Sequence, residues 1–435
     1  MMLRAVAFLV LVALPARAEL PIVEVTSPGG IKAWLVEDRS IPFVALELRF
    51  RGGTNLDAPG KRGAVNLMTA LLEEGTGDLD AQGFAEARDA LAASLQFDVG
   101  RDSLSVSARA LTENRAEAMN LLRQALTAPR FDPDAIERVR GQVLSNIASN
   151  DKDPSDLAAR AFDALAWGDH PYGSSGDGTA ESVAALTRDD LLAAHRAAVA
   201  QDRVYVAAAG DISPEDLGRL IDDLISGLPE TGAPQAERAA FGLTGGVSVR
   251  EFPVPQSVVV FGHEGMKRDD PDFFAAFLMN EILGGGRFSA RLMTEVREKR
   301  GLTYGIGSYL APMDAGETFM GQFSTDNAKV AEAIEVVRTE WRRMAEGGVT
   351  PAELATAKTY QTGSYPLRFD GNAQIARILV GMQVQGLPID YATNRNAYIE
   401  AVTVEDVARV AAGLVRPDDL HFVVVGQPAG LAAGQ

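Results

Sequence analysis

The sequence contains no cysteine and only four histidines among its 435 residues. Without cysteine, neither a disulfide framework nor a thiolate metal site can form. The histidines are His170, His195, His263 and His421. No two of them are three or four residues apart, the spacing at which one helix face presents two metal ligands. We therefore expect no metal site within this chain. The alternative is a site assembled by the fold from distant histidines.

Basic residues are also in the minority, with 41 Lys and Arg against 59 Asp and Glu, and the net charge is −18. No run of Lys or Arg interrupts this balance, which excludes nucleic acid as a natural partner. Acidic walls would favour basic or neutral peptides as ligands. Beyond the N-terminal segment, no apolar stretch is long enough to span a bilayer, so we expect no membrane span in the mature chain.

The N-terminal segment has the pattern of a bacterial secretory signal peptide. Arg4 precedes an apolar run over residues 5–14, and Ala16-Arg17-Ala18 supplies small residues at the cleavage positions. We expect residues 1–18 to be removed and the mature chain to be periplasmic. The alternative is an uncleaved N-terminal membrane anchor.

The mature chain is longer than one hydrophobic core usually serves, and it repeats itself once. At an offset of 216 residues and without a gap, segment 186–191 aligns with 402–407, and the apolar segment 204–209 aligns with 420–425. A threonine-capped acidic helix, an apolar strand and a glycine thus recur in order. Duplication explains this run better than chance.

The repeat predicts two similar α+β domains, each with a mostly antiparallel sheet and helices packed on one face. We place the N-terminal domain at 19–228, a Gly/Pro-rich linker at 229–246, and the C-terminal domain at 247–435. Apolar residues alternate with Ala45, Glu47 and Arg49 over segment 44–50, which indicates a strand with one face inward and one outward. Helices are expected over residues 84–95 and 328–344.

Segment 63–76 reads as a helix that runs into a Gly-Thr turn. Here the chain resembles the insulinase/pitrilysin/mitochondrial-processing-peptidase family, whose inverted zinc motif is H-x-x-E-H. The resemblance places Asn66 and Ala70 where the two histidines would stand, and Thr69 where the catalytic glutamate would stand. A further family glutamate falls within residues 143–147, which contain no carboxylate. Zinc in such a site needs imidazoles and a carboxylate as ligands, and a second carboxylate to deprotonate water. These positions supply none of them.

A second segment extends the resemblance. Residues 283–292 form a Gly-rich turn entering a helix, and residues 297–304 match the family's R-E-x-x-G-L-x-Y pattern. The resemblance selects Arg297 and Tyr304, which in relatives reach across a closed cavity and hold the substrate carbonyl. A guanidinium and a phenol hydroxyl suit a developing oxyanion. We expect Tyr304 to begin the next strand. On spacing alone, Arg297 would be a solvated helix charge and Tyr304 a packing residue. Gly284-Gly285-Gly286 lacks a following Gly-Lys-Ser/Thr, so we predict a tight turn and no nucleotide site.

The resemblance implies half of a clamshell: a subunit without zinc that pairs with a homologous, zinc-binding peptidase subunit. Peptide or unfolded polypeptide would be the substrate, bound as an added strand at a sheet edge. No cofactor is expected in this chain, and zinc is expected in the partner. The alternative is a catalytically inert scaffold, like the processing-peptidase-like core proteins of respiratory complexes. A self-sufficient peptidase with a displaced metal site is a second alternative.

Overall fold

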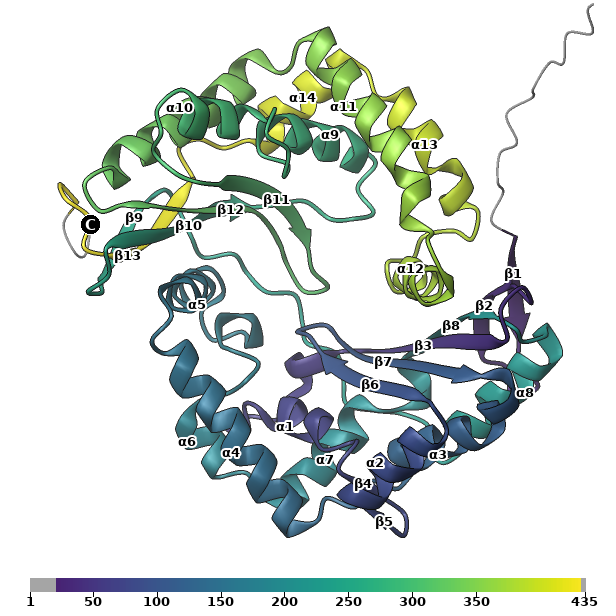
Figure 1. Ribbon diagram of the computed structural model, residues 1–435. Coiled ribbons are helices and arrows are strands. Elements are labelled where there is room, and N and C mark those ends of the chain that lie inside the picture. Colours follow the sequence, from purple (N-terminus) through teal and green to yellow (C-terminus); the bar gives the residue numbers. More distant parts are fainter. Residues whose placement is uncertain (1–20, 432–435) are drawn as a thin grey trace, which may run out of the picture.

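The computed structural model describes residues 21–431, so the predicted signal peptide at residues 1–18 lies outside the described residues. Two halves face each other across a central space, each with one sheet and several helices (Figure 1). The first half contains a six-stranded sheet and the second half a five-stranded sheet. The predicted α+β class with two similar domains is confirmed. Among the described residues, no helix has the length and apolar character needed to cross a bilayer.

The first half is built on the sheet order β1-β2-β8-β3-β7-β6, with β4-β5 as a separate small pair. Its strands are β1 (Ile22–Thr26), β2 (Lys32–Glu37), β3 (Phe43–Arg51), β4 (Gly75–Thr76), β5 (Leu79–Asp80), β6 (Ser94–Val99), β7 (Ser103–Leu111) and β8 (Val204–Gly210). Its helices are α1 (Ala64–Ala70), α2 (Ala81–Ala90), α3 (Arg115–Thr127), α4 (Pro133–Asn150), α5 (Pro154–Trp167), α6 (Ala180–Ala184), α7 (Arg188–Ala198) and α8 (Pro214–Ile225). Short 3₁₀ turns are η1 (Gly53–Leu56), η2 (Thr112–Asn114), η3 (Pro171–Gly173) and η4 (Gln201–Arg203).

The second half has the order β11-β12-β10-β13-β9. Its strands are β9 (Gly246–Glu251), β10 (Gln256–Glu264), β11 (Ile306–Pro312), β12 (Glu317–Asp326) and β13 (His421–Gly426). Its helices are α9 (Phe273–Leu283), the π-helical turn η5 (Met293–Glu298), α10 (Val330–Gly347), α11 (Pro351–Ser364), the 3₁₀ turn η6 (Tyr365–Arg368), α12 (Asn372–Val384), α13 (Tyr391–Ala401) and α14 (Val404–Leu414). Residues 229–245, between the halves, form neither helix nor strand.

The predicted duplication is visible in the order of the strands. The run β2-β8-β3-β7-β6 of the first sheet matches β9-β13-β10-β12-β11 of the second. Both sheets have the same single parallel pair, β2 with β8 and β9 with β13, beside antiparallel neighbours. The aligned helices α7 and α14 begin with the same capping box, in which Thr187 and Thr403 pair with Asp190 and Asp406.

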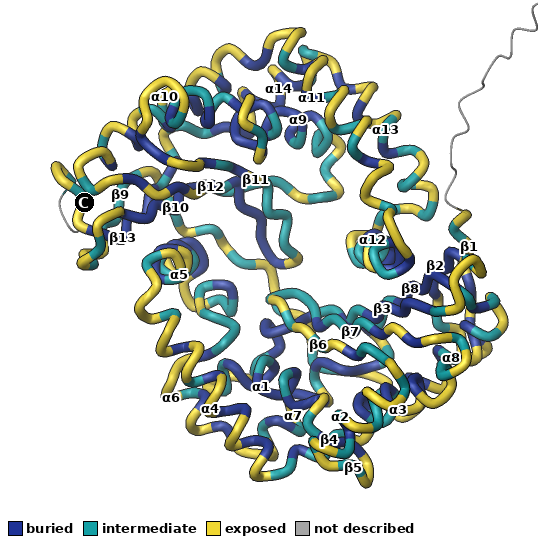
Figure 2. Tube along the Cα trace, in the orientation of Figure 1, coloured by how far each residue is buried: buried dark blue, intermediate teal, exposed yellow. Residues whose placement is uncertain are grey.

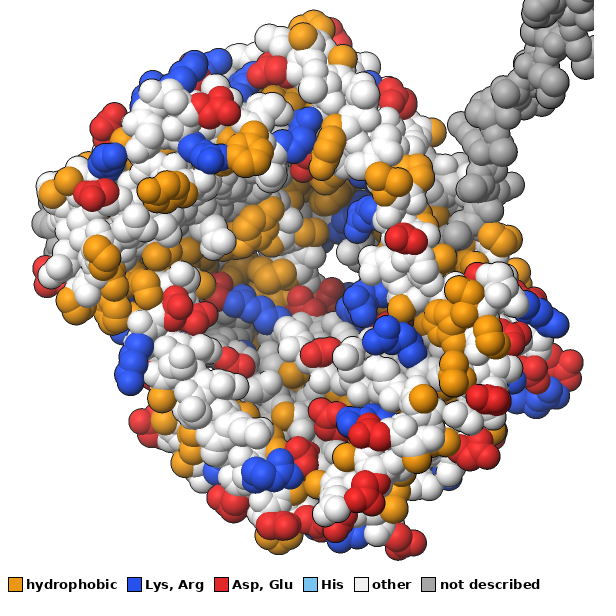
Figure 3. All heavy atoms as spheres, in the orientation of Figure 1, with side chains coloured by type: hydrophobic (Ala, Val, Ile, Leu, Met, Phe, Trp, Pro, Cys, Tyr) orange, Lys and Arg blue, Asp and Glu red, His pale blue; other side chains and the backbone are white. Residues whose placement is uncertain are grey.

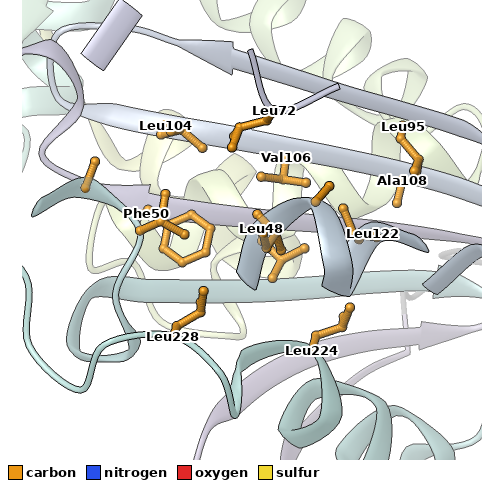
Figure 4. Packing of buried hydrophobic residues seen from close by; sticks show 14 of the residues in the cluster. Leu48, Phe50, Leu72, Leu95, Leu104, Val106, Ala108, Leu122, Leu224 and Leu228 are labelled. Carbon is orange, nitrogen blue, oxygen red and sulfur yellow. The ribbon is translucent and has the colours of Figure 1, made fainter. Parts of the chain in front are cut away.

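The first core lies between one face of the sheet and helices α1, α2, α3, α7 and α8. Leu48 and Phe50 of β3 and Val106 of β7 point from the sheet toward Leu122 of α3 and Leu224 of α8 (Figure 4). The side chains of all five are at least 99% buried. The buried stretches run along the strands and the inner sides of these helices (Figure 2). Burial of this apolar surface is the main stabilisation of the half.

The opposite face of each sheet is covered by a helix from the other half (Figure 1). Helix α12 packs Leu379 and Val380 against Trp34 of β2 and Ala207 of β8. Helix α5 packs in the same way on β10 and β13, in a cluster that contains Phe162. The expectation that β3 has an outward face is therefore wrong. Its polar side is also buried, because α12 closes over it.

Two predicted boundaries differ from the structure. The helix expected over residues 84–95 ends at Ala90, and β6 begins at Ser94. Ala92 has φ of 48°, a left-handed conformation that a helix cannot continue through. Tyr304, expected to open a strand, lies two residues before β11.

Candidate functional site

Helix α1 carries the positions of the missing zinc motif, and a buried carboxylate fixes where the helix begins. Asp57 accepts hydrogen bonds from the backbone N–H groups of Gly63 at 2.9 Å and Val65 at 2.8 Å. Arg62 forms an ion pair with Asp57 at 3.2 Å. Gly63 has φ of 93°, and a Cβ there would lie 2.6 Å from the carbonyl oxygen of Asp177. A negative charge at this helix N-terminus is electrostatically favourable.

Asn66 and Ala70 face a cavity of about 370 Å³ that Asn146 of α4 also lines. The fold thus brings together the two motif positions and two residues, Val143 and Asn146, of the segment where the family has a further glutamate. Thr69 is 2% exposed, and its hydroxyl donates a 2.7 Å hydrogen bond to the carbonyl of Val65 within α1. That hydroxyl is engaged by the helix and cannot act as a general base.

The side chains at this cavity do not fit zinc. Carboxamides such as those of Asn66 and Asn146 are poor ligands beside imidazole and carboxylate, and Ala70 has no lone pair. Asn66 instead donates a 3.3 Å hydrogen bond to Asp177, the cavity's only carboxylate. Within residues 21–431, no group of three or more His, Cys, Asp or Glu is placed to hold a metal ion.

Each histidine makes at least one hydrogen bond within the protein. His170 lies 3.0 Å from the carbonyl of Glu237, and His195 lies 2.8 Å from the carbonyl of Leu126. His263 is fully buried, and burial lowers its pKa to about 4. The fourth, His421, lies between Ser248 and the carbonyl of Thr244. Burial also lowers the pKa of His195 and of His421. These environments are those of structural histidines.

Three further polar residues line the cavity and were not predicted from the sequence: Gln142, Asn150 and Asp177. Gln142, Asn146 and Asn150 are spaced four residues apart, which places them on one face of α4. This carboxamide stripe is visible in the sequence once the helix is assumed. Asp177 carries no such signal, because it comes from the loop that leads into α6.

Arg297 and Tyr304 lie on either side of the end of the π-helical turn η5. Gly301, with φ of 59°, donates its N–H to the carbonyl of Arg297 at 2.9 Å and closes the turn. The guanidinium of Arg297 stacks on the ring of Phe288 at 4.7 Å and has no ion-pair partner among the described residues. Tyr304 is 87% exposed and lines a cavity of about 670 Å³.

The triple glycine is a tight turn with close backbone packing, as predicted. A Cβ on Gly284 would lie 2.2 Å from the hydroxyl of Ser308, and one on Gly285 would lie 2.6 Å from the carboxylate of Glu281. Ser308 donates its N–H to the carbonyl of Gly284 at 2.8 Å, which joins the turn to β11. Gly286 has open space around it and borders the cavity of Tyr304.

Two family models match most of the chain. The model described as Insulinase (Peptidase family M16) matches residues 32–179, and the model described as Peptidase M16 inactive domain matches residues 185–360. Among curated proteins, the Non-peptidase homolog YmxG of Helicobacter pylori is 25% identical over 390 residues, covering 89% of this chain and 90% of that protein. A Streptomyces coelicolor protein named an uncharacterized zinc protease is 27% identical over 410 residues, covering 92% and 85%.

Solved structures agree with these matches. A crystal structure of a peptidase M16 inactive domain from Pseudomonas fluorescens is 31% identical, has a TM-score of 0.89, and covers 96% of this chain and 99% of that one. The crystal structure of a protease from Helicobacter pylori shares the fold, with a TM-score of 0.84 at 18% identity, over 93% and 99% of the two chains. The chain therefore belongs to the M16, or insulinase, family of peptidases.

Proposed function

We propose that this chain is the non-zinc-binding subunit of a periplasmic, two-chain zinc peptidase of the M16 family. A homologous partner carries H-x-x-E-H and binds zinc. This chain completes the chamber in which a peptide or unfolded polypeptide is held. It presents Arg297 and Tyr304 to the peptide bound at the partner. These two side chains donate hydrogen bonds to the substrate carbonyl and stabilise the negative charge that develops on it.

The observation that carries the proposal is a contrast between two parts of the chain. At the zinc-motif positions, Asn66 and Ala70 leave the cavity without metal ligands. In the second half, Arg297 has no carboxylate partner among the residues that the structure describes, and Tyr304 is exposed at a cavity. A chain that had lost every role in peptide hydrolysis would have no use for a guanidinium without an ion-pair partner a few residues from a phenol exposed at a cavity.

The relatives support the same interpretation. The Helicobacter pylori relative bears the name Non-peptidase homolog, and 90% of it aligns with this chain. Other relatives of similar identity are named zinc proteases, and one is named a probable mitochondrial-processing peptidase subunit beta, from Schizosaccharomyces pombe. A family that contains both kinds of member offers the expected pair, one subunit with the metal and one without it.

An inert scaffold is the second candidate function. The packing of α5 and α12 favours it. Each of these helices packs on the sheet of the other half, so the two halves form one rigid unit. A scaffold of this kind needs neither Arg297 nor Tyr304. The two functions therefore differ in what these side chains contribute.

The test is peptide hydrolysis by this chain, by the zinc-binding homologue from the same organism, and by the two together. We expect activity only in the mixture, with loss of activity on chelation. Arg297→Ala and Tyr304→Phe should each lower kcat by 10-fold or more, since one oxyanion donor contributes roughly 10²–10³ in rate. Arg300→Ala, which removes an exposed arginine from the same segment, is the matched control. Full activity in both variants would support the scaffold, and activity of this chain alone would contradict both functions.

A further inference from the structure

A cavity of about 760 Å³ lies in the second half where α9, β11, η6, α12 and α13 meet. Figure 3 shows the hollow between the halves, and hydrophobic, basic and acidic side chains all lie along its wall. The cavity volume is within the ~300–1,000 Å³ range of ligand pockets. Its lining contains four arginines and a single carboxylate, in a protein whose net charge is −18. The lining of the cavity is therefore positively charged, whereas the whole protein is negatively charged. The expectation of acidic walls is wrong at this place.

Three of the four arginines have no carboxylate partner in the part of the chain that the structure describes: Arg268, Arg368 and Arg395. The fourth, Arg377, lies 3.9 Å from Glu47 of the opposite half. The one lining carboxylate, Glu281, is directed to Arg287 at 3.9 Å. At three of the four arginines, the positive charge is therefore not neutralised by the described residues.

Arg395 is the most constrained of these cations. It is 6% exposed, its guanidinium donates to the backbone and side-chain oxygens of Gln361 at 2.9 and 3.0 Å, and it stacks on Tyr365 at 4.4 Å. Burial lowers the pKa of Arg395. A buried charge with only neutral partners is costly, and an anion beside it would remove much of that cost.

Aromatic rings hold the second arginine of the cavity. Arg268 stacks over Phe273 at 4.2 Å and donates a 3.0 Å hydrogen bond to the hydroxyl of Tyr391. Phe274 and Phe277 add apolar surface to the same wall. A ligand that fits this wall has both a negative charge and an apolar or aromatic body.

The strand β11 supplies the feature that favours a peptide over a small anion. β11 is an edge strand, and the backbone N–H and C=O of Ser308 point away from β12, toward Gly284 and Asn280. Because these groups alternate along a strand, those of Leu310 also point away from β12. Leu310 lines the cavity, so an extended chain can pair with it there.

We propose that this cavity binds acidic peptide segments, with a peptide carboxylate against Arg268, Arg368 and Arg395 and the peptide backbone along Leu310. The cavity borders that of Tyr304, because Gly286, Ser308 and Tyr309 line both. That this peptide is the substrate rests on the proposed function. The binding itself does not, since this chain provides every residue involved.

The test is calorimetric titration of the purified chain alone with unlabelled, acetylated octapeptides of extended sequence around one phenylalanine. Three peptides end in a C-terminal amide and carry two glutamates, two glutamines or two lysines. The fourth carries two glutamines and a free C-terminal carboxylate. We expect a carboxylate-bearing peptide to bind at least 10-fold more tightly than the glutamine amide, and the lysine peptide to bind most weakly. The glutamate peptide and the peptide with the free C-terminal carboxylate distinguish a side-chain carboxylate from a terminal one.

The variant Arg368→Ala should weaken binding of the acidic peptide about 10-fold, because the peptide carboxylate loses a charge-assisted hydrogen bond. Arg368 is exposed, so the fold does not depend on it. Arg342→Ala, an exposed arginine of α10 outside the cavity, is the matched control and should bind normally. Equal binding of the acidic and lysine peptides, no binding of any peptide, or equal loss in both variants would overturn the proposal. None of these results depends on hydrolysis, so they are separate from a failure of the two-chain peptidase.

Discussion

The hydroxyl of Tyr172 donates a 2.6 Å hydrogen bond to the carboxylate of Asp102 and accepts one from the backbone N–H of Ala315 at 2.9 Å. Tyr172 and Asp102 belong to the first half, and Ala315 lies in the β11–β12 turn of the second. A single buried phenol thus makes hydrogen bonds to both halves. Burial raises the pKa of Tyr172 and of Asp102, so the phenol stays protonated and remains a donor.

Replacing Tyr172 with Phe should lower the free energy of unfolding by about 1–3 kcal/mol, because the carboxylate of Asp102 and the N–H of Ala315 lose a buried partner. Urea unfolding followed by circular dichroism measures this loss. Tyr360→Phe removes an exposed hydroxyl and should be neutral within about 0.5 kcal/mol. An equally small effect at Tyr172 would mean that the halves are not held together through this hydroxyl.

The buried imidazole of His263 should make the protein less stable in mild acid. Its Nδ1–H donates to the carbonyl of Glu264 at 2.8 Å, and its Nε2 accepts from the indole of Trp341 at 3.1 Å. Burial lowers its folded pKa to about 4, from 6.5. The unfolded chain therefore binds more protons between these values, and stability that is complete above pH 6.5 is lost as the pH falls toward 4.

For His263 alone this loss is of the order of 3 kcal/mol. His195 and His421 act in the same direction, because burial lowers their pKa values too. Unfolding midpoints in urea, measured from pH 7 to pH 4.5, should fall more steeply for the wild type than for His263→Gln, in which the side-chain oxygen still accepts the indole N–H. Parallel slopes would mean that the imidazole is not the group that titrates.

Restoring three ligands should restore a metal site. The structure selects the positions: Asn66→His, Ala70→His and Asn146→Glu all face the cavity on α1 and α4. We expect the triple variant to bind about one zinc ion per chain, since two imidazoles and a carboxylate form an open zinc site. Atomic emission after dialysis measures the metal content, and the wild type should retain none above background. The matched control, Asn66→His with Ala70→His alone, should bind zinc more weakly.

Because α5 and α12 each pack on the sheet of the other half, we expect the two halves to unfold together. Leu379 of α12 is fully buried against the sheet of the first half, so Leu379→Ala should cost about 2–5 kcal/mol and destabilise both halves at once. Differential scanning calorimetry should show one transition in the wild type and one, at lower temperature, in the variant. Leu367→Ala, at a position 78% exposed, is the control. Two separate transitions in the wild type would contradict the prediction that α5 and α12 make the halves unfold cooperatively.

Much of the fold could be predicted because its signals are local. The threonine caps and the core-facing apolar positions of β3 are set by nearby residues in the chain, and the repeat can be read by aligning the sequence with itself; the structure agrees with all three. The absence of zinc ligands at Asn66, Thr69 and Ala70 is equally local, because ligand chemistry is a property of the residue itself. The selection of Arg297 and Tyr304 as functional residues stays a prediction.

Tertiary structure alone decided which distant segments meet. The periodicity of α12 shows that it has an apolar face, but hydrophobic attraction is not directional, and nothing local tells that face to cover the sheet of the other half. The same holds for Arg268 and Arg395, which are more than a hundred residues apart and line one cavity without a carboxylate to neutralise them. The net charge of a protein can be counted from its sequence. The charge of a cavity depends on which charged residues the fold places in its lining.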